Sequence, residues 1–99
     1  MMITGAMCRA ARALVQIGRP HLAVVSKVDE AIIEAFELHT DTPDDATLSA
    51  LQTALEDLGA TFLPEDGARG VGVRLKFSRG VTKRIDILEN EGGIGVDPV

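Results

Sequence analysis

The chain has 99 residues, with 10 Lys or Arg against 15 Asp or Glu, so its formal charge at pH 7 is −5. That length suits one small domain, and a hydrophobic content of 45% is too high for a disordered chain. A single cysteine excludes an internal disulfide and favours a reducing, cytoplasmic setting. No apolar run approaches the ~20 residues that span a bilayer, so we expect neither a membrane protein nor a secreted one.

Helical periodicity runs through the first part of the chain. Thr4 can cap a first helix, and Gly18 ends it. Pro20 suits the first turn of a second, short helix, because a proline there loses no hydrogen bond. The apolar positions that we expect to face the core from these two helices are Met7, Ala10, Ala11, Leu14, Val15, Leu22, Ala23 and Val25.

Two more helices are predicted before residue 59. Asp29 can cap the third, and a polar loop over residues 39–45 leads to the fourth, which starts at Asp45 and is stopped by Gly59. Their apolar side chains recur with helical spacing, so we expect them in the core: Ile32, Ile33, Phe36, Leu48, Leu51, Ala54, Leu55 and Leu58.

After residue 59 the period changes to two. The short run 61–63 and the alternating run 71–77 predict a β-hairpin, and a last helix is expected to begin at Ser78. An isolated hairpin is marginally stable, so it should pack on the helices or pair with another subunit. Its apolar residues are the candidate contacts of a homodimer: Val71, Val73, Leu75 and Phe77. The predicted fold class is mainly α, four or five helices with a hairpin and final helix, divided at 1–59, 60–93 and a tail 94–99.

Charge is unevenly distributed along the chain. Residues 1–26 hold three arginines and no acid, whereas residues 27–57 hold one lysine against nine acids. The densest positive patch lies in the last third: Arg74, Lys76, Arg79, Lys83 and Arg84. It is either an alternative phosphate contact or the partner of the acidic third helix of a second subunit, in a charge-complementary dimer. An acidic total therefore does not exclude nucleic-acid binding, which depends on where the basic face lies.

The segment from Cys8 to Glu37, CRAARALVQIGRPHLAVVSKVDEAIIEAFE, resembles the first three helices of the lambda-repressor-like helix-turn-helix family, the Xre/Cro group. The matching positions are Arg9, Arg12, Leu14, Leu22, Ala23, Val28, Ile33, Phe36 and Glu37. Residues 42–77 are similar to the fourth helix and hairpin of short alphaproteobacterial members, and the resemblance covers residues 4–93. It implies a lambda-repressor-like bundle that binds double-stranded DNA as a homodimeric transcriptional regulator, with Arg12 paired to Glu37.

The DNA-facing positions of that pattern carry unusual residues here. The Ser-Gln pair whose Gln holds a phosphate is Gly18-Arg19, and the turn glycine is Lys27. Left-handed geometry costs a non-glycine residue of order 1 kcal/mol, so we expect a reshaped turn. The outward positions of the recognition helix are largely acidic. The candidate DNA-binding residues are Arg19, His21, Lys27, Asp29, Glu30, Ile32 and Glu34.

Two functions stay open. The first is DNA-binding regulation with an atypical readout, since phosphates repel carboxylates although a carboxylate can accept from cytosine N4. The alternative is a degenerate helix-turn-helix module, whose acidic helix over residues 29–37 docks on a basic protein such as another regulator or the transcription machinery.

Catalysis and cofactor binding are not expected. The chain lacks a Gly-x-Ser-x-Gly nucleophile turn and a phosphate-binding glycine loop followed by Lys-Ser/Thr. His21, His39 and Cys8 share no metal-ligand spacing, so we expect no metal site. The histidines are expected at the surface, and Cys8 is most simply a small core residue.

Overall fold

The computed structural model describes residues 2–77. The elements are α1 (Gly5–Val15), α2 (Arg19–Ser26), α3 (Glu30–Glu37), α4 (Asp45–Asp57), β1 (Ala60–Leu63) and β2 (Gly72–Leu75). The described chain is thus mainly helical with a small antiparallel hairpin, which confirms that part of the predicted fold class. The predicted final helix, together with Arg79, Lys83 and Arg84, lies outside the described residues. Within residues 2–77 the longest helix, α4, has 13 residues, and no helix is long and apolar enough to cross a membrane.

Short side-chain caps set the helix starts that the sequence predicts. Thr4 Oγ1 accepts a hydrogen bond from the Met7 amide at 3.1 Å, and Asp29 Oδ1 accepts one from the Ala31 amide at 3.0 Å. The cap of α4 is Asp44, one residue before the predicted start, and its carboxylate accepts from the Thr47 amide at 2.8 Å. These bonds satisfy amides that have no partner inside the helix, so each start is fixed locally.

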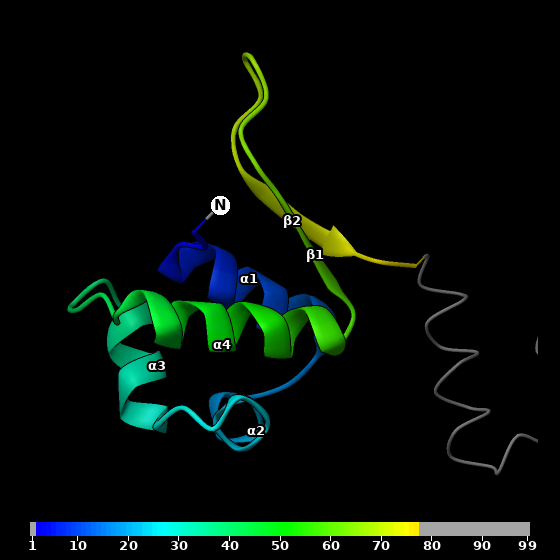
Figure 1. Ribbon diagram of the computed structural model, residues 1–99. Coiled ribbons are helices and arrows are strands. Elements are labelled where there is room, and N and C mark those ends of the chain that lie inside the picture. The colour runs from blue at the N-terminus through cyan, green and yellow to red at the C-terminus, as the bar shows by residue number, and fades with distance from the viewer. Residues whose placement is uncertain (1, 78–99) are drawn as a thin grey trace, which may run out of the picture.

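The core joins all four helices and both strands. Figure 1 shows α1 and α4 in the middle of the molecule, with the hairpin on one side and α2 and α3 on the other. The apolar side chains with the least exposure come from every helix and from β1: Cys8, Ala11, Leu22, Ile33, Leu51, Leu55 and Ala60. The buried Cys8 confirms the prediction for that residue.

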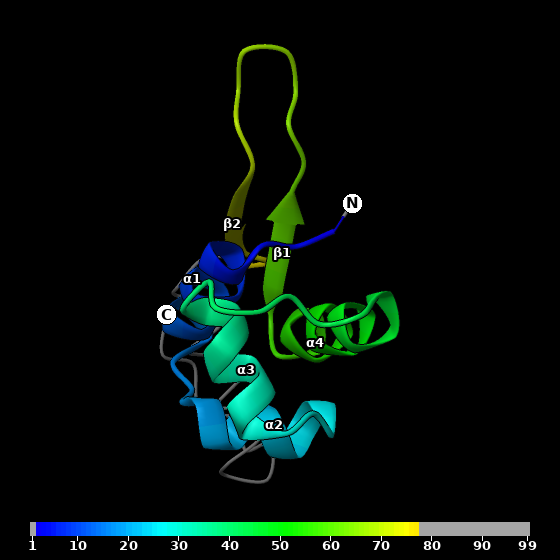
Figure 2. The same cartoon turned by 90° about the vertical axis from the view of Figure 1, so that its left-hand side faces the viewer.

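The hairpin is packed on the helices through one of its faces. The register pairs Ala60 with Leu75 and Phe62 with Val73, and both residues of β1 are buried. Directly opposed residues share a face, so Val73 and Leu75 also face the helices, and Val73 packs against the core. The connecting loop extends away from the body (Figure 2).

The residues predicted for a dimer contact differ in their exposure within one subunit. Val71, Val73, Leu75 and Phe77 do not form one exposed apolar edge. Val73 and Leu75 are half-buried in the same subunit, because their face of the strand covers α1. Val71 and Phe77 flank the strand and are exposed.

The sequence also predicts more core residues on the helices than the structure buries. Ala10, Leu14, Val25 and Ile32 were expected inside but are exposed, and Ile32 retains 43% of its accessible surface. Successive helical residues point about 100° apart, so only one of the adjacent pair Ile32 and Ile33 can face the core. Ile33 takes that position and is fully buried.

Candidate nucleic-acid interface

The α2–α3 unit, residues 19–37, contains most of the residues that the sequence singles out for DNA contact. Its connection is Lys27, Val28 and Asp29, and Lys27 lies in the left-handed region at φ 62° and ψ 29°. The expectation that a lysine would reshape this turn is therefore wrong. Ser26 Oγ donates to the Leu22 carbonyl at 2.7 Å and accepts from the Val28 amide at 3.2 Å, and Val28 itself is buried. These contacts hold Lys27 in its strained conformation.

A buried carboxylate ties α1, α2 and α3 together. Glu37, at the end of α3, is fully buried, and its Oε1 lies 2.6 Å from Arg12 Nη2 and 3.0 Å from Arg19 Nε. Its Oε2 accepts from Arg12 Nε at 2.7 Å and from Cys8 Sγ at 3.2 Å. The expected pair between Arg12 and Glu37 is confirmed. The involvement of Arg19 was not expected, because that residue was assigned to phosphate contact.

The electrostatics of this cluster favour an ionised Glu37. Burial alone raises the pKa of Glu37, but the hydrogen bonds from Arg12, Arg19 and Cys8 outweigh it and lower the pKa below its usual 4.5. Burial and the adjacent carboxylate raise the pKa of the Cys8 thiol well above its ordinary value, so the thiol stays protonated and acts as a donor. The cluster therefore consists of one anion held between two cations.

A close backbone approach fixes the same end of α3. Gly5, in the first turn of α1, leaves no space for a side chain, because a Cβ would overlap the Phe36 carbonyl oxygen and lie 3.2 Å from the Glu37 Cα. Sequence reasoning missed both this glycine and the full burial of Glu37. A signal for the second existed, since Ile33, Phe36 and Glu37 share the spacing of one helix face.

The outward surface of α3 is acidic. Glu30 and Glu34 are exposed on it, beside the exposed Ala31 and Ile32. Further exposed carboxylates lie at the cap of α3, in the α3–α4 connection and at the start of α4. With Glu30 and Glu34 they make up what we call the acidic face: Asp29, Glu30, Glu34, Asp41, Asp44 and Asp45. Both salt bridges within residues 2–77 involve Glu37, so the acidic face has no ion pair in that range.

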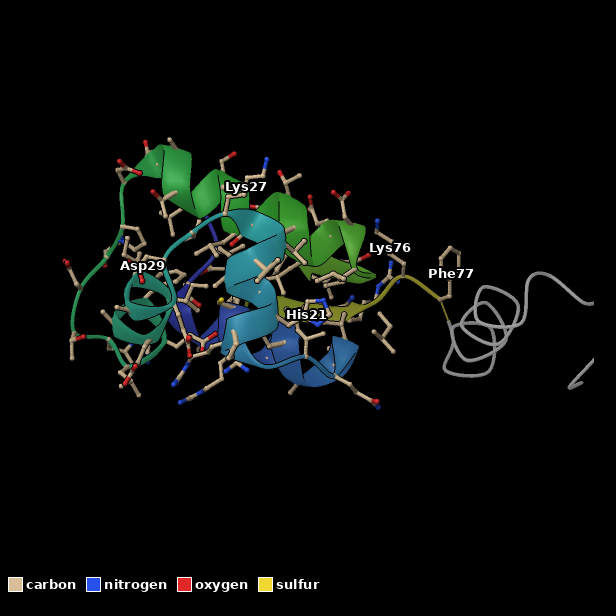
Figure 3. All side chains as sticks on the ribbon, turned by 90° about the horizontal axis from the view of Figure 1, so that it is seen from below. His21, Lys27, Asp29, Lys76 and Phe77 are labelled. Atoms are coloured by element: carbon tan, nitrogen blue, oxygen red, sulfur yellow. The ribbon has the colours of Figure 1, made fainter. Side chains whose placement is uncertain are left out.

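The predicted cations are divided between two sides of the molecule. His21 and Lys27 are exposed near opposite ends of α2, and Asp29 lies beside α3 (Figure 3). The side chain of Arg19 is 27% exposed because its Nε is bound to Glu37. Of the alternative basic patch, Arg74 and Lys76 are exposed on the hairpin, and Lys76 lies on the far side from Asp29 (Figure 3). Arg19, His21 and Lys27 thus all belong to the α2–α3 unit, with His21 and Lys27 near opposite ends of α2, whereas Arg74 and Lys76 lie on the hairpin.

No family model matches the chain, and no curated protein is significantly similar to it. Across the described range, residues 2–77, no three His, Cys, Asp or Glu side chains gather in a geometry that could hold a metal ion.

Proposed function

We propose that this chain is a small DNA-binding transcriptional regulator of the lambda-repressor-like helix-turn-helix class, the Xre/Cro group, acting in the cytoplasm as a homodimer. The α2–α3 unit is its DNA-binding element, and α3 is the helix presented to the major groove. The resemblance of residues 4–93 to that family supports this proposal. So does the order of four helices followed by a hairpin.

The observation that carries the proposal is the left-handed turn at Lys27. A residue other than glycine holds this geometry at a cost of order 1 kcal/mol, as Gln16 and His39 also do beyond the ends of α1 and α3. Here the strained residue carries an exposed cation at the junction of α2 and α3. This turn connects α2 to α3 within three residues and places the positive charge of Lys27 beside the start of α3.

The phosphate backbone is contacted by the cations of the α2–α3 unit. His21 and Lys27 are exposed, and the terminal guanidinium nitrogens of Arg19 make no hydrogen bond to the described residues. Arg19 therefore holds Glu37 through Nε and offers its terminal nitrogens to a phosphate. Contacts of this kind set the register of a protein on the duplex and carry no sequence information.

Sequence is read by the outward side chains of α3. The carboxylates of Glu30 and Glu34 accept from cytosine N4, and Ile32 contacts a thymine methyl group. Asp29 contributes less directly, because its Oδ1 caps α3. With acidic readers and few cations, binding depends strongly on each phosphate contact.

A salt-dependent DNA titration tests the proposal. A labelled library of genomic fragments is mixed with the full chain from low to high salt, and the retained fragments are sequenced. We expect retention at low salt and a logarithmic affinity that falls with log salt by a slope of about −0.9 for each phosphate neutralised. Failure to retain any fragment at the lowest salt contradicts the proposal.

Lys27→Gly provides a sharp variant, because it removes the cation and accepts the left-handed geometry. We expect weaker binding and a salt slope smaller by about one unit per bound subunit. Gln16→Gly is the matched control, since Gln16 has the same φ of 62° at the end of α1, outside the α2–α3 unit. Equal effects of the two substitutions on DNA affinity contradict a contact by Lys27.

The acidic face favours a second candidate function, a protein-interaction module that acts on a basic regulator or on the transcription machinery. The supporting observation is that six carboxylates around α3 have no ion pair within residues 2–77. In this case the pair Glu30→Arg and Glu34→Arg abolishes capture of the partner from a native lysate and leaves the helical circular dichroism unchanged. Capture that is unaffected by the pair removes this candidate.

A further inference from the structure

The buried carboxylate of Glu37 is fully occupied by hydrogen bonds. Its Oε1 accepts from Arg12 Nη2 and Arg19 Nε, and its Oε2 accepts from Arg12 Nε and Cys8 Sγ. An ionised carboxylate offers about four lone-pair sites, so no site remains for another donor. Arg12 takes two of these sites as a bidentate pair, and its Nη1 donates to the Ile17 carbonyl at 3.2 Å. Arg12 is therefore used entirely inside the protein and neutralises Glu37 by itself.

Arg19 is the surplus cation of this cluster. A single carboxylate cannot neutralise two guanidinium groups, and the first turn of α2, where Arg19 lies, contains no acidic residue. Arg19 is bound through Nε, and its two terminal nitrogens make no hydrogen bond within residues 2–77. The side chain keeps 27% of its surface exposed. The cluster therefore holds a partly exposed guanidinium whose charge and terminal nitrogens are available to an anion.

The bond to Glu37 restricts where the terminal nitrogens of Arg19 can lie. Nε and the terminal nitrogens share one rigid plane, so anchoring Nε orders the whole group before an anion arrives. Ordering a long, flexible side chain during binding costs about three- to tenfold in affinity, and prior anchoring avoids that cost. His21 and Lys27 are exposed and have no ion pair within residues 2–77, so they lack such an anchor.

We propose that Glu37 is a positioning residue for DNA binding: it holds Arg19 through Nε, so that the terminal nitrogens of the same guanidinium meet a DNA phosphate already oriented. Glu37 is fully buried and does not touch the DNA itself. The inference rests on the proposed DNA-binding function and names a residue that serves it from inside the protein. Because Glu37 ends α3, the phosphate contact of α2 and the helix that reads the bases share one anchor.

A double-mutant cycle on DNA affinity tests this role in the full chain. The variants are Glu37→Gln, Arg19→Ala and their combination, titrated over a salt series against a DNA fragment that the unmodified chain retains. We expect Glu37→Gln to weaken binding about three- to tenfold per bound subunit, with an unchanged salt slope because the cation stays. Arg19→Ala should lower the slope by about one unit per bound subunit, and adding Glu37→Gln to it should cost less than about twofold more.

Both the sign and the coupling separate positioning from other roles of Glu37. Removal of its negative charge would by itself strengthen the attraction of DNA, so weaker binding is not a charge effect. A merely structural role, in which Glu37 pairs with Arg12 to join α1 and α3, would weaken binding equally with Arg or Ala at position 19. An equal loss in both backgrounds overturns the proposal, and so does unchanged or tighter binding by Glu37→Gln.

Arg19→Lys tests the same role while the pair between Arg12 and Glu37 stays in place. A lysine has a single nitrogen, which reaches either Glu37 or a phosphate, whereas arginine reaches both with different nitrogens. We expect binding to be about three- to tenfold weaker per bound subunit. The matched control is Arg9→Lys, at an exposed position of α1, which should leave the DNA affinity unchanged. Equal affinities of the two lysine variants contradict the positioning role.

Failure of this inference is distinguishable from failure of the proposed function. If the unmodified chain binds no DNA at low salt, both are overturned. If it binds DNA and the substitutions at positions 19 and 37 act independently, only the positioning role is overturned. Helical circular dichroism at the titration temperature shows that each variant is folded, and Arg19→Lys decides the question if Glu37→Gln is not.

Discussion

The backbone of Gly5 lies directly against the carbonyl group of Phe36, so that a methyl group on Gly5 would overlap that oxygen. A Cβ is fixed to the backbone of α1, and the atoms that it would meet belong to the backbone of α3, so neither side can rotate away. One residue further along, Glu37 joins α3 to Arg12 and Arg19. The orientation of α3 therefore depends on a steric contact and an ionic cluster at the same helix end.

Gly5→Ala is expected to destabilise the protein by about 2–3 kcal/mol, because α1 and α3 must separate to admit the methyl group. Alanine usually stabilises a helix relative to glycine, so the sign of the change is itself informative. Urea unfolding followed by circular dichroism measures it. Gly70→Ala is the control, since no atom lies within 4 Å of its Cβ position and its stability should change by less than about 0.5 kcal/mol. A stable Gly5→Ala protein contradicts the close approach.

Glu37→Gln is expected to cost about 2–3 kcal/mol, because two guanidinium groups lose their buried anion. The figure is modest for a buried pair, since the side chains of Arg12 and Arg19 remain 15% and 27% exposed. Glu34→Gln, three residues earlier and exposed, is the matched control and should be nearly neutral. Equal stability of the two variants is incompatible with the ionic cluster.

The same variant predicts a pH dependence. The pKa of Glu37 is lowered in the folded state from 4.5, so its contribution to stability is complete above about pH 4.5 and is lost as the pH falls through the lowered folded value. The difference in unfolding free energy between the unmodified chain and Glu37→Gln should be constant at neutral pH and shrink on acidification below about pH 4.5. Urea titrations over a pH series measure it. If the difference in unfolding free energy grows on acidification, the pKa of Glu37 is not lowered in the folded state.

Lys27→Gly and Gln16→Gly are each expected to stabilise the protein by about 0.5–1 kcal/mol, because glycine accepts φ 62° without the Cβ penalty. Lys27→Val should have the opposite effect, since a β-branched residue is poorly tolerated there. Thermal and urea unfolding of the three variants test the prediction. If Lys27→Gly is destabilised, the turn is not left-handed in solution.

Cys8 is the only cysteine of the chain and is expected to react with a thiol reagent only when the core opens. Its raised pKa keeps it protonated, and reactivity requires the thiolate. Ala6→Cys, at an exposed position of the same helix, should react at once. In Glu37→Gln the labelling of Cys8 should accelerate by roughly 30-fold if the variant loses about 2 kcal/mol. Immediate labelling of Cys8 in the unmodified protein contradicts its burial.

Local chemistry made much of the secondary structure predictable. The caps Thr4 and Asp29 and the proline at position 20 act within a few residues of themselves, so the sequence indicated where α1, α2 and α3 begin. The change from a helical period to a period of two marked the hairpin in the same way. A carboxylate that reaches a nearby amide needs no other part of the chain, which is why these predictions are confirmed.

What sequence patterns could not decide is which members of an apolar or charged set meet another element. Ile32 and Ile33 are chemically alike, and only the packing of α3 puts Ile33 in the core and leaves Ile32 exposed. The sequence predicts Arg19 as a phosphate ligand, whereas in the structure its Nε lies against the carboxylate of Glu37. The sequence by itself determined the helices, the hairpin and the acidic character of residues 27–57. Only the tertiary structure decided which charges are neutralised and which face outward, because those outcomes depend on contacts between residues far apart along the chain.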